Sequence, residues 1–242
     1  MVTVDLTGKI AIITGASRGI GKSIACALAA QNATVILVAR SKKDIQSLAQ
    51  QITSTGGKAQ AIPLDISQEK EVIDFFNDVV KRYEKLDILI NNAGVNARGK
   101  ILETPMDALD NVMKVNIRGT FLCCREGLRV MALQKNGTII NMSSVMGFRG
   151  YVDQAAYAAS KHAVVGMTKT LAIEAKEYNV RVSVIHPGAV ATEMGLSARP
   201  DLDPQVMIHP EDIAQVVLFL LSLSEHCAID EIYIRRKSGS PF

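Results

Sequence analysis

The sequence of 242 residues is poor in aromatic residues and has little net charge. It contains no Trp and only 5% aromatic residues, which argues against the stacking platforms that hold single-stranded nucleic acid. Lys and Arg number 27 and Asp and Glu number 24. The resulting formal charge of +3 is too small for the dense basic stripe of a nucleic-acid-binding protein. We therefore expect no nucleic-acid partner.

The chain also lacks the cysteine spacing of a metal site or a disulfide framework. None of its four cysteines forms a Cys-x-x-Cys motif, and Cys123 and Cys124 are adjacent in a segment with helical character. Adjacent helical positions point about 100° apart, which suits neither a metal cage nor a disulfide. We expect buried thiols in a reducing compartment, and no metal.

No apolar run is long enough to cross a membrane. The longest runs, residues 24–30 and 216–221, fall far short of the roughly 20 residues that a bilayer requires. The first residues show neither the basic region nor the apolar region of a signal peptide. These absences predict a cytoplasmic protein with no membrane partner.

What the chain does have is a regular alternation of short apolar runs and longer amphipathic segments. Several runs are apolar continuously, as in strands buried on both faces of a parallel sheet. The expected strands are residues 10–13, 35–39, 61–64, 88–90, 138–142, 180–185 and 229–234. The expected helices are residues 20–31, 42–55, 69–84, 107–134, 155–178 and 210–223. The pattern predicts an α/β fold with one domain over residues 1–242, a doubly wound, seven-stranded and mostly parallel sheet with helices on both faces.

A glycine-rich segment, residues 14–21, follows the first expected strand and opens the first helix. Its spacing, G-x-x-x-G-x-G, is one residue wider than the common dinucleotide fingerprint. Glycines let backbone N–H groups approach a phosphate, and a helix N-terminus behind them favours its negative charge. The position predicts a nucleotide site, the alternative being a tight turn without a ligand. The expected cofactor contacts in this segment are Gly15, Ser17, Arg18, Gly19, Ile20 and Gly21.

The end of the second expected strand favours NADP over NAD. An NAD enzyme usually places a carboxylate there for the ribose hydroxyls, whereas this chain has Arg40 and Ser41 and no acid before Asp44. The guanidinium groups of Arg40 and Arg18 suit a 2′-phosphate. Alternatively, these basic side chains belong to the solvated surface.

Three later segments occur in order, each at or just after a strand end. Asn91-Asn92-Ala93-Gly94 ends the fourth strand, Asn141-Met142-Ser143-Ser144 ends the fifth, and Tyr157-x-x-x-Lys161 lies in the next helix. With the glycine-rich segment, this set resembles the short-chain dehydrogenases/reductases over residues 5 to about 222. The resemblance implies a single Rossmann domain and hydride transfer between NAD(P) and a carbonyl/alcohol pair.

The Tyr157 and Lys161 pair also makes chemical sense without the resemblance. Reduction of a ketone needs a hydride on one side and a proton for the developing alkoxide on the other. Tyr157 can supply that proton if its pKa falls from about 10 toward neutrality. Lys161 shares its helical face and would place a cation beside the phenol. We expect Tyr157 to act as general acid/base in an NADP(H)-dependent oxidoreductase that interconverts a carbonyl and a secondary alcohol.

The resemblance implies two further catalytic residues. Ser144 lies thirteen residues before Tyr157, the interval of the family's serine that bonds the substrate oxygen; by chemistry alone Ser143 is its rival. Asn116 matches the fourth catalytic position, where the family's helix is kinked and a bound water links Lys161 to solvent. Lys161 would also bond the nicotinamide ribose.

The remaining contacts are expected around the same cleft. Asp65 would accept from the adenine amino group or cap the following helix, and His186 is interpreted as a packed residue at a strand end. The other expected cofactor contacts are Ile66, Asn92, Ala93, Gly94, Pro187, Gly188, Val190 and Thr192. A short substrate loop, residues 193–209, suits a small or extended substrate. The expected pocket wall is Val145, Met146, Tyr151 and Met194, beside Ser144 and Tyr157.

The C-terminal end departs from the family pattern. It lacks the family's Asp-Gly-Gly after the last strand, and its basic run at residues 235–237 predicts an exposed tail. This departure weakens the match to the 3-oxoacyl-(acyl-carrier-protein) reductases and to their tetramer. We expect a homodimer or homotetramer that uses the helices near residues 107–134 and 155–178. A 3-oxoacyl-(acyl-carrier-protein) reductase, or a non-catalytic nucleotide-sensing protein, remains the alternative function.

Overall fold

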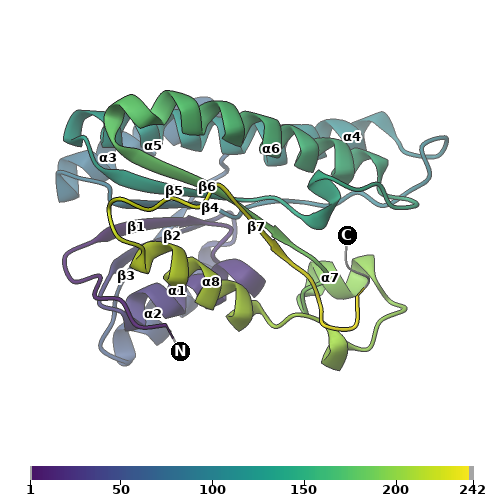
Figure 1. Ribbon diagram of the computed structural model, residues 1–242, viewed down its shortest axis with the longest axis horizontal. Coiled ribbons are helices and arrows are strands. Elements are labelled where there is room, and N and C mark those ends of the chain that lie inside the picture. Colours follow the sequence, from purple (N-terminus) through teal and green to yellow (C-terminus); the bar gives the residue numbers. More distant parts are fainter. Residues whose placement is uncertain (1, 240–242) are drawn as a thin grey trace.

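A seven-stranded parallel sheet forms the centre of the molecule, with helices on both faces (Figure 1). The computed structural model describes residues 2–239. The strands are β1 (Ile10–Thr14), β2 (Thr34–Ala39), β3 (Lys58–Pro63), β4 (Ile88–Asn91), β5 (Gly137–Met142), β6 (Val180–Pro187) and β7 (Glu231–Ile234). Their order is β3-β2-β1-β4-β5-β6-β7, and all neighbours pair in parallel. The predicted doubly wound sheet is confirmed.

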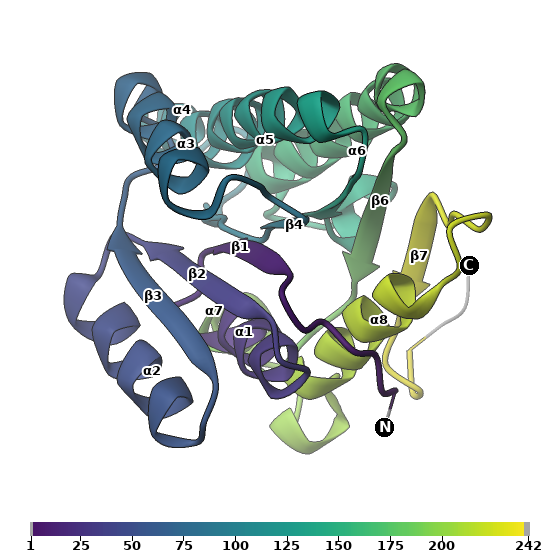
Figure 2. The ribbon, with the colours of Figure 1, turned by 90° about the vertical axis from the view of Figure 1, so that its left-hand side faces the viewer.

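The helices divide between the two faces of the sheet (Figure 2). One layer holds α1 (Gly19–Ala30), α2 (Lys42–Ser54) and α8 (Pro210–Ser222). The other holds α3 (Glu69–Tyr83), α4 (Met106–Met113), α5 (Thr120–Gln134) and α6 (Ala155–Ala175). The short helix α7 (Glu193–Ala198) lies outside both layers, near the C-terminal end of the sheet.

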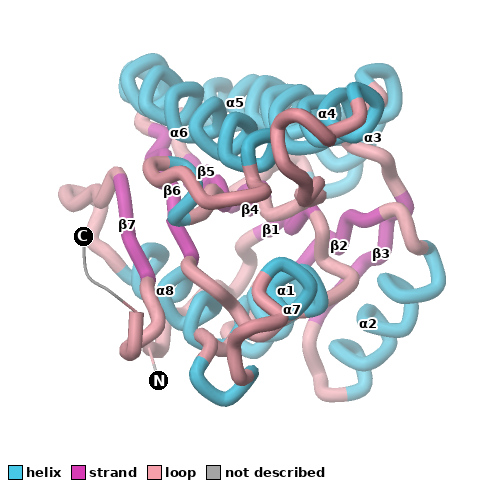
Figure 3. Tube along the Cα trace, turned by 90° about the vertical axis from the view of Figure 1, so that its right-hand side faces the viewer, coloured by secondary structure: helices cyan, strands magenta, loops and turns pink. Residues whose placement is uncertain are grey.

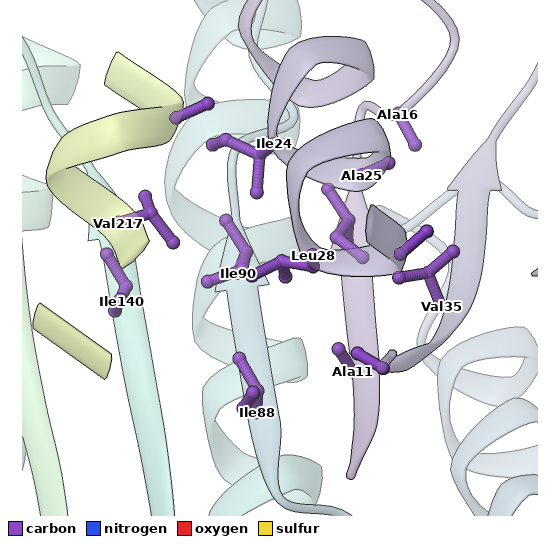
Figure 4. Packing of buried hydrophobic residues seen from close by; sticks show 14 of the residues in the cluster. Ala11, Ala16, Ile24, Ala25, Leu28, Val35, Ile88, Ile90, Ile140 and Val217 are labelled. Carbon is purple, nitrogen blue, oxygen red and sulfur yellow. The ribbon is translucent and has the colours of Figure 1, made fainter. Parts of the chain in front are cut away.

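Each strand contributes side chains alternately to two cores, as a pleated strand buried on both faces must. Ile13, Ile90 and Ile140 face the α1, α2 and α8 layer, together with Leu28 and Val217 (Figure 4). Their neighbours Ile12, Leu89 and Ile139 face α3, α5 and α6. This double burial explains why the strands read as continuous apolar runs and why their positions could be predicted.

The helix expected over residues 107–134 is present over Met106–Gln134, but its hydrogen-bonding pattern changes in the middle. Between α4 and α5, Lys114–Gly119 forms a wider turn with i→i+5 geometry. Gly119 is pressed against Ile66 there, and a Cβ on it would lie 2.7 Å from Ile66 Cγ1. The widened turn brings Asn116 inward, where it is buried.

Smaller differences occur at element ends. β3 starts at Lys58 rather than residue 61, because this edge strand is only half-buried and shows no apolar run. β7 starts at Glu231 rather than residue 229, and α6 ends at Ala175, before a 3₁₀ turn over Lys176–Tyr178. Asn179 closes that turn in the left-handed region, at φ 56°.

The cysteines are free thiols, but only two are buried. Cys123 and Cys124 lie in the core as expected, whereas Cys26 is half-buried and Cys227 exposed. The expectation of buried thiols was therefore wrong for the second pair, because Cys26 borders the cleft described below and Cys227 lies in the loop before β7. Over residues 2–239, no helix has both the length and the apolar character needed to cross a bilayer.

Candidate active site

A large cleft runs along the carboxyl ends of the strands, where the strand order reverses between β1 and β4. Its volume of about 1910 Å³ exceeds the roughly 300–1,000 Å³ of an ordinary small-ligand pocket, which leaves room for a dinucleotide and a substrate. Most of the predicted residues line it: Gly15, Ser17, Arg18, Gly19, Ile20, Arg40, Ser41, Asp65, Ile66, Asn92, Ala93, Gly94, Ser144, Val145, Met146, Tyr151, Tyr157, Lys161, Pro187, Gly188, Val190, Thr192 and Met194. Gly21 and Asn116 lie behind its wall.

The glycine-rich loop has the shape that a phosphate cradle needs. Gly15 and Gly19 adopt φ of +65° and +54°, a region that L side chains rarely enter. A Cβ on Gly21 would lie 2.3 Å from the Gly15 carbonyl oxygen, so Gly21 shapes the loop from behind. The N-terminus of α1 has no side-chain cap at Arg18. Its first backbone N–H groups are therefore suited to a phosphate, and the loop fits a dinucleotide.

Polar bonds from β4 hold this loop in place. Asn92 Nδ2 donates to the carbonyl oxygens of Thr14 at 3.1 Å and Gly15 at 3.2 Å. Thr14 Oγ1 accepts from the backbone N–H groups of Asn92 and Ala93. The Asn92 side chain therefore braces the cradle, while Asn91 donates to Asn141 Oδ1 at 2.9 Å and ties β4 to β5.

The adenosine end of the cleft carries the basic residues expected to select the cofactor. Burial raises the pKa of Asp65, but hydrogen bonds from Ser67 lower it by more, and the charge of Arg40 adds a smaller lowering. Asp65 Oδ1 accepts from the Ser67 N–H at 3.0 Å. Asp65 therefore both turns the chain before α3 and borders the cleft. Arg18 instead forms an ion pair with Glu193 of α7.

The two candidate serines point in different directions. Ser144 Oγ accepts from the Met146 N–H at 3.2 Å, donates to the Pro187 carbonyl oxygen at 3.5 Å, and lies near enough to Tyr157 in the cleft to lower its pKa against the effect of burial. Ser143 Oγ donates to the Lys161 carbonyl oxygen at 3.1 Å. The choice of Ser144 over Ser143, made from the interval to Tyr157, agrees with this geometry.

Lys161 is buried in the cleft floor and Tyr157 is half-buried beside it, and removal from water shifts their pKa values in opposite directions. Burial raises the pKa of Tyr157 to about 12, although the hydrogen bond with Ser144 opposes it. Burial lowers the pKa of Lys161 to about 8. Lys161 Nζ donates to the Met142 carbonyl oxygen at 2.9 Å and lies 5.5 Å from the centre of the Tyr157 ring.

The expected fall of the Tyr157 pKa is therefore not what the structure shows. Removing the phenolate from water raises the pKa of Tyr157 by more than Ser144 lowers it. A phenol with a pKa near 12 is protonated at neutral pH. That is the form required to give a proton to a developing alkoxide.

Asn116 is fully engaged in holding the wall behind Lys161. Its Oδ1 accepts from the Val95 N–H at 2.8 Å, and its Nδ2 donates to the Val95 carbonyl oxygen at 2.9 Å and to Ser160 Oγ at 3.0 Å. A Cβ on Gly94 would lie 3.3 Å from Asn116 Oδ1 and 3.6 Å from Lys161 Nζ. Asn116 thus fixes the segment that separates it from Lys161.

Comparison with known proteins now assigns the chain to a family. A family model described as short chain dehydrogenase matches residues 9–203. The chain belongs to the short-chain dehydrogenase family. It is 35% identical over 228 residues to a 3-oxoacyl-[acyl-carrier-protein] reductase of Aquifex aeolicus, an alignment that covers 90% of this chain and 92% of the relative.

Two solved short-chain dehydrogenase-like structures cover nearly all of this chain. A metagenomic short-chain oxidoreductase in complex with NADP is 33% identical with a TM-score of 0.86, covering 97% of this chain and 100% of its own. An NAD⁺-bound xylitol dehydrogenase is 28% identical with a TM-score of 0.87, covering 96% and 99%. Oxidoreductase chemistry with a nicotinamide cofactor therefore follows from the family.

In this short-chain dehydrogenase Arg235, Lys237 and Ser238 are exposed, as expected for the tail, but the segment after β7 also borders the cleft. The Gly188 N–H donates to the Ile234 carbonyl oxygen at 2.7 Å, which continues the pairing of β6 with β7. Arg235, Arg236 and Gly239 line the cleft. The only sequence signal was the basic run itself, because nothing in it shows the direction in which the chain turns after β7.

His186 is packed behind Ser144, as expected for a strand-end residue. It is fully buried, and its Nδ1 lies 3.2 Å from the Ser144 carbonyl oxygen. Its ring stacks on Tyr233 with centroids 4.5 Å apart. Burial lowers the pKa of His186 despite the nearby carboxylate of Glu231, so the imidazole is a neutral support of this dehydrogenase's β6–β7 edge.

Proposed function

We propose that this protein is an NADP(H)-dependent reductase that converts a carbonyl compound to a secondary alcohol, and the reverse, with Tyr157 as general acid/base. The observation that carries the proposal is that Ser144, Tyr157 and Lys161 line one cleft, with Lys161 Nζ 5.5 Å from the centre of the Tyr157 ring. The bound cofactor supplies or takes up the hydride. The residues of the chain supply the proton and stabilise the charge that develops on the substrate oxygen.

Two side chains act on the substrate oxygen, and a third acts through Tyr157. Ser144 donates a hydrogen bond to the carbonyl oxygen and holds it beside the Tyr157 hydroxyl, which gives up its proton as negative charge develops. Lys161, charged at neutral pH with a pKa of about 8, stabilises the negative charge left on the Tyr157 oxygen. Asn116 keeps the adjoining wall in place through Val95.

The direct test is the consumption of NADPH by the purified protein with a panel of simple ketones, 2- and 3-oxo acids and acyl thioesters, with the alcohol product identified. Reduction of at least one carbonyl class, with recovery of the matching alcohol, is expected. If the protein binds NADPH but reduces none of the panel, it is a nucleotide-sensing protein instead.

A 3-oxoacyl thioester is the second candidate substrate, and it is favoured by the 35% identity to a 3-oxoacyl-[acyl-carrier-protein] reductase. The panel separates the two possibilities. A preference of the enzyme for acetoacetyl thioesters over all free ketones and oxo acids would place it in that class. The short substrate loop of residues 193–209, with its single short helix α7, favours a small substrate.

We also propose that the enzyme works in the cytoplasm as a homo-oligomer. Its four thiols are free, which agrees with a reducing compartment. Exposed apolar side chains on α4, α5 and α6, namely Met106, Phe121 and Ile173, support a contact between two copies through this layer.

A further inference from the structure

The segment after β7 lies at the end of the cleft opposite the adenosine side. β7 occupies one edge of the sheet and β3 the other; the expected 2′-phosphate contact Arg40 follows β2, next to β3. Figure 3 shows β7 at its edge, and Figure 1 shows it running toward α7. Ile234 pairs with Pro187, and a Cβ on Gly188 would lie 3.6 Å from Arg235 Cα. The tail therefore begins beside the segment expected to back the nicotinamide.

Three arginines meet at this end, and we call Arg199, Arg235 and Arg236 the C-terminal basic wall. All three line the cleft. Arg199 donates to Asp201 through Nε at 2.7 Å and Nη2 at 2.6 Å. The hydrogen bond with Arg199 lowers the pKa of Asp201 to about 2, and the charge of Arg236 contributes a smaller lowering.

The wall has an excess of positive charge. Arg236 Nη1 donates to Ser238 Oγ, and Arg235 Nη1 donates to the backbone carbonyl oxygens of residues 236, 237 and 239. These bonds orient both guanidinium groups without neutralising them. Asp201, the carboxylate at this wall, is already engaged by Arg199.

The other carboxylates that line the cleft, within the described part of the chain, are placed elsewhere. Asp44 and Asp65 stand at the adenosine end, after β2 and β3. Glu193 is paired with Arg18, and Glu211 accepts from Ser23 at 2.8 Å. Among residues 2–239, the carboxylates that line the cleft therefore leave Arg235 and Arg236 without a salt bridge.

The wall also stands on the substrate side of the cleft. Tyr151, which is expected in the substrate pocket, lines the cleft together with Phe148, and Phe148 packs edge-on against Tyr233 of β7 with ring centroids 4.6 Å apart. Tyr151 belongs to the segment between Ser144 and Tyr157. A substrate whose carbonyl oxygen lies at Ser144 and Tyr157 would extend from there toward the wall.

We propose that the C-terminal basic wall binds an acid group on the carbonyl substrate, so that the enzyme prefers oxo compounds carrying a carboxylate or phosphate to neutral ketones. Guanidinium groups bind both acids through paired, charge-assisted hydrogen bonds. The inference rests on the proposed function, since it names the class of substrate that the reductase selects.

The test uses short oxo acids with one to three carbons between the carbonyl and the carboxylate, each paired with its methyl ester. Dihydroxyacetone phosphate and dihydroxyacetone form the phosphate arm. We expect each preferred acid to exceed its neutral partner at least about 10-fold in kcat/KM. Arg235→Gln and Arg236→Gln should lower kcat/KM for the acid about 10- to 100-fold, mainly through KM, because each removes a charged hydrogen-bond donor. They should leave the neutral partner nearly unchanged.

Lys237→Gln is the matched control, because Lys237 is an exposed neighbour in the same tail that carries the same charge; it should leave both substrates unchanged. Equal use of acid and neutral partners, or an equal loss for both in the arginine variants, would overturn the proposal. The arm with the larger preference distinguishes carboxylate from phosphate.

Calorimetry separates this inference from the reductase activity. Each acid is titrated into the protein loaded with NADP⁺, with no turnover required. If no carbonyl is reduced, the proposed function fails, but acid binding that is lost in Arg235→Gln and Arg236→Gln still supports the basic wall. If neither the oxo acids nor dihydroxyacetone phosphate binds, or if their binding survives both substitutions, the basic wall is excluded as an acid site.

Discussion

At the scale of single residues, we expect Tyr157 and Lys161 to set the pH range of the proposed reaction. Tyr157, with a pKa raised to about 12, stays protonated well above neutrality, whereas Lys161, with a pKa lowered to about 8, loses its charge just above pH 8. The proton of Tyr157 is therefore available both below and above pH 8, whereas the positive charge of Lys161 is lost above about pH 8. We therefore expect the deprotonation of Lys161 to set the upper pH limit of carbonyl reduction.

We predict that kcat/KM for reduction is level below about pH 8 and falls about tenfold per pH unit above it. The sign follows from the lowered pKa of Lys161, because deprotonation removes the positive charge that stabilises the Tyr157 oxygen. A pH profile at saturating NADPH measures it. A rate that stays level to pH 10 would show that the ammonium of Lys161 is not required.

Arg40 decides the cofactor on this account. The substitution Arg40→Asp removes the guanidinium that faces the expected 2′-phosphate and places a carboxylate there for the ribose hydroxyls. We predict that the ratio of kcat/KM for NADPH to that for NADH falls at least about 10-fold. Lys43→Asp, a change of the same charge on neighbouring α2, is the control. An unchanged ratio in Arg40→Asp would contradict the assignment of NADP.

The sequence predicted which residues meet at the site better than it predicted their physical state. The interval from Ser144 to Tyr157 and the helical spacing from Tyr157 to Lys161 are local, so both could be read from the chain. The pKa of Tyr157 depends on burial by residues far away in sequence, which spacing does not reveal. The same holds for Arg235 and Arg236, whose place in the cleft depends on a turn after β7.

At the scale of elements, an ion pair joins the glycine-rich loop to α7 across the cleft. Arg18 precedes α1 and Glu193 is the first residue of α7, and both side chains are largely exposed. Gly19 reinforces the contact, because a Cβ on it would lie 2.9 Å from Thr192 Cγ2. The pair holds Arg18 away from the end of the cleft where Arg40 stands.

We predict that Glu193→Gln binds NADPH about two- to fivefold more tightly and leaves NADH unchanged. Releasing Arg18 for the 2′-phosphate is expected to gain no more than an exposed ion pair is worth. Fluorescence titration with both cofactors measures this, and Glu225→Gln, an exposed glutamate after α8, is the control. Weaker NADPH binding, or an equal shift for NADH, would contradict it.

The helix predicted over residues 107–134 shows why an irregular turn within a helix is harder to predict than a buried strand. Its apolar pattern continues through the break, so the pattern cannot reveal the wider turn at Lys114–Gly119. The turn arises because Asn116 bonds to Val95 and Ser160, contacts that exist only in the folded chain. By contrast, each buried strand is a continuous apolar run, so its position can be predicted from its own residues.

At the scale of the whole molecule, positive charge stands at both ends of one cleft. Arg40 lies beyond β2 and the C-terminal basic wall beyond β7, with Tyr157 between them. The small net charge of +3 conceals this arrangement. On this account the cleft takes an anionic cofactor from one end and an anionic substrate from the other.

The helix layer opposite α1 and α8 is the expected contact between subunits. We predict that Phe121→Glu, at a site 53% exposed on α5, converts the oligomer to a smaller species because it buries a charge in the contact. Light scattering after gel filtration measures the mass. Phe219→Glu, on α8 and 42% exposed, is the control on the opposite face. If Phe219→Glu breaks the assembly and Phe121→Glu does not, the contact uses the other layer.

The most direct test of the central claim compares the wild-type enzyme with Tyr157→Phe, using NADPH and the best carbonyl substrate of the panel. Phenylalanine keeps the ring and removes only the hydroxyl that donates the proton. We predict that kcat falls about 100-fold or more, while the dissociation constant for NADPH stays within about twofold. A Tyr157→Phe enzyme that retains most of its turnover would contradict the assignment of Tyr157 as the acid.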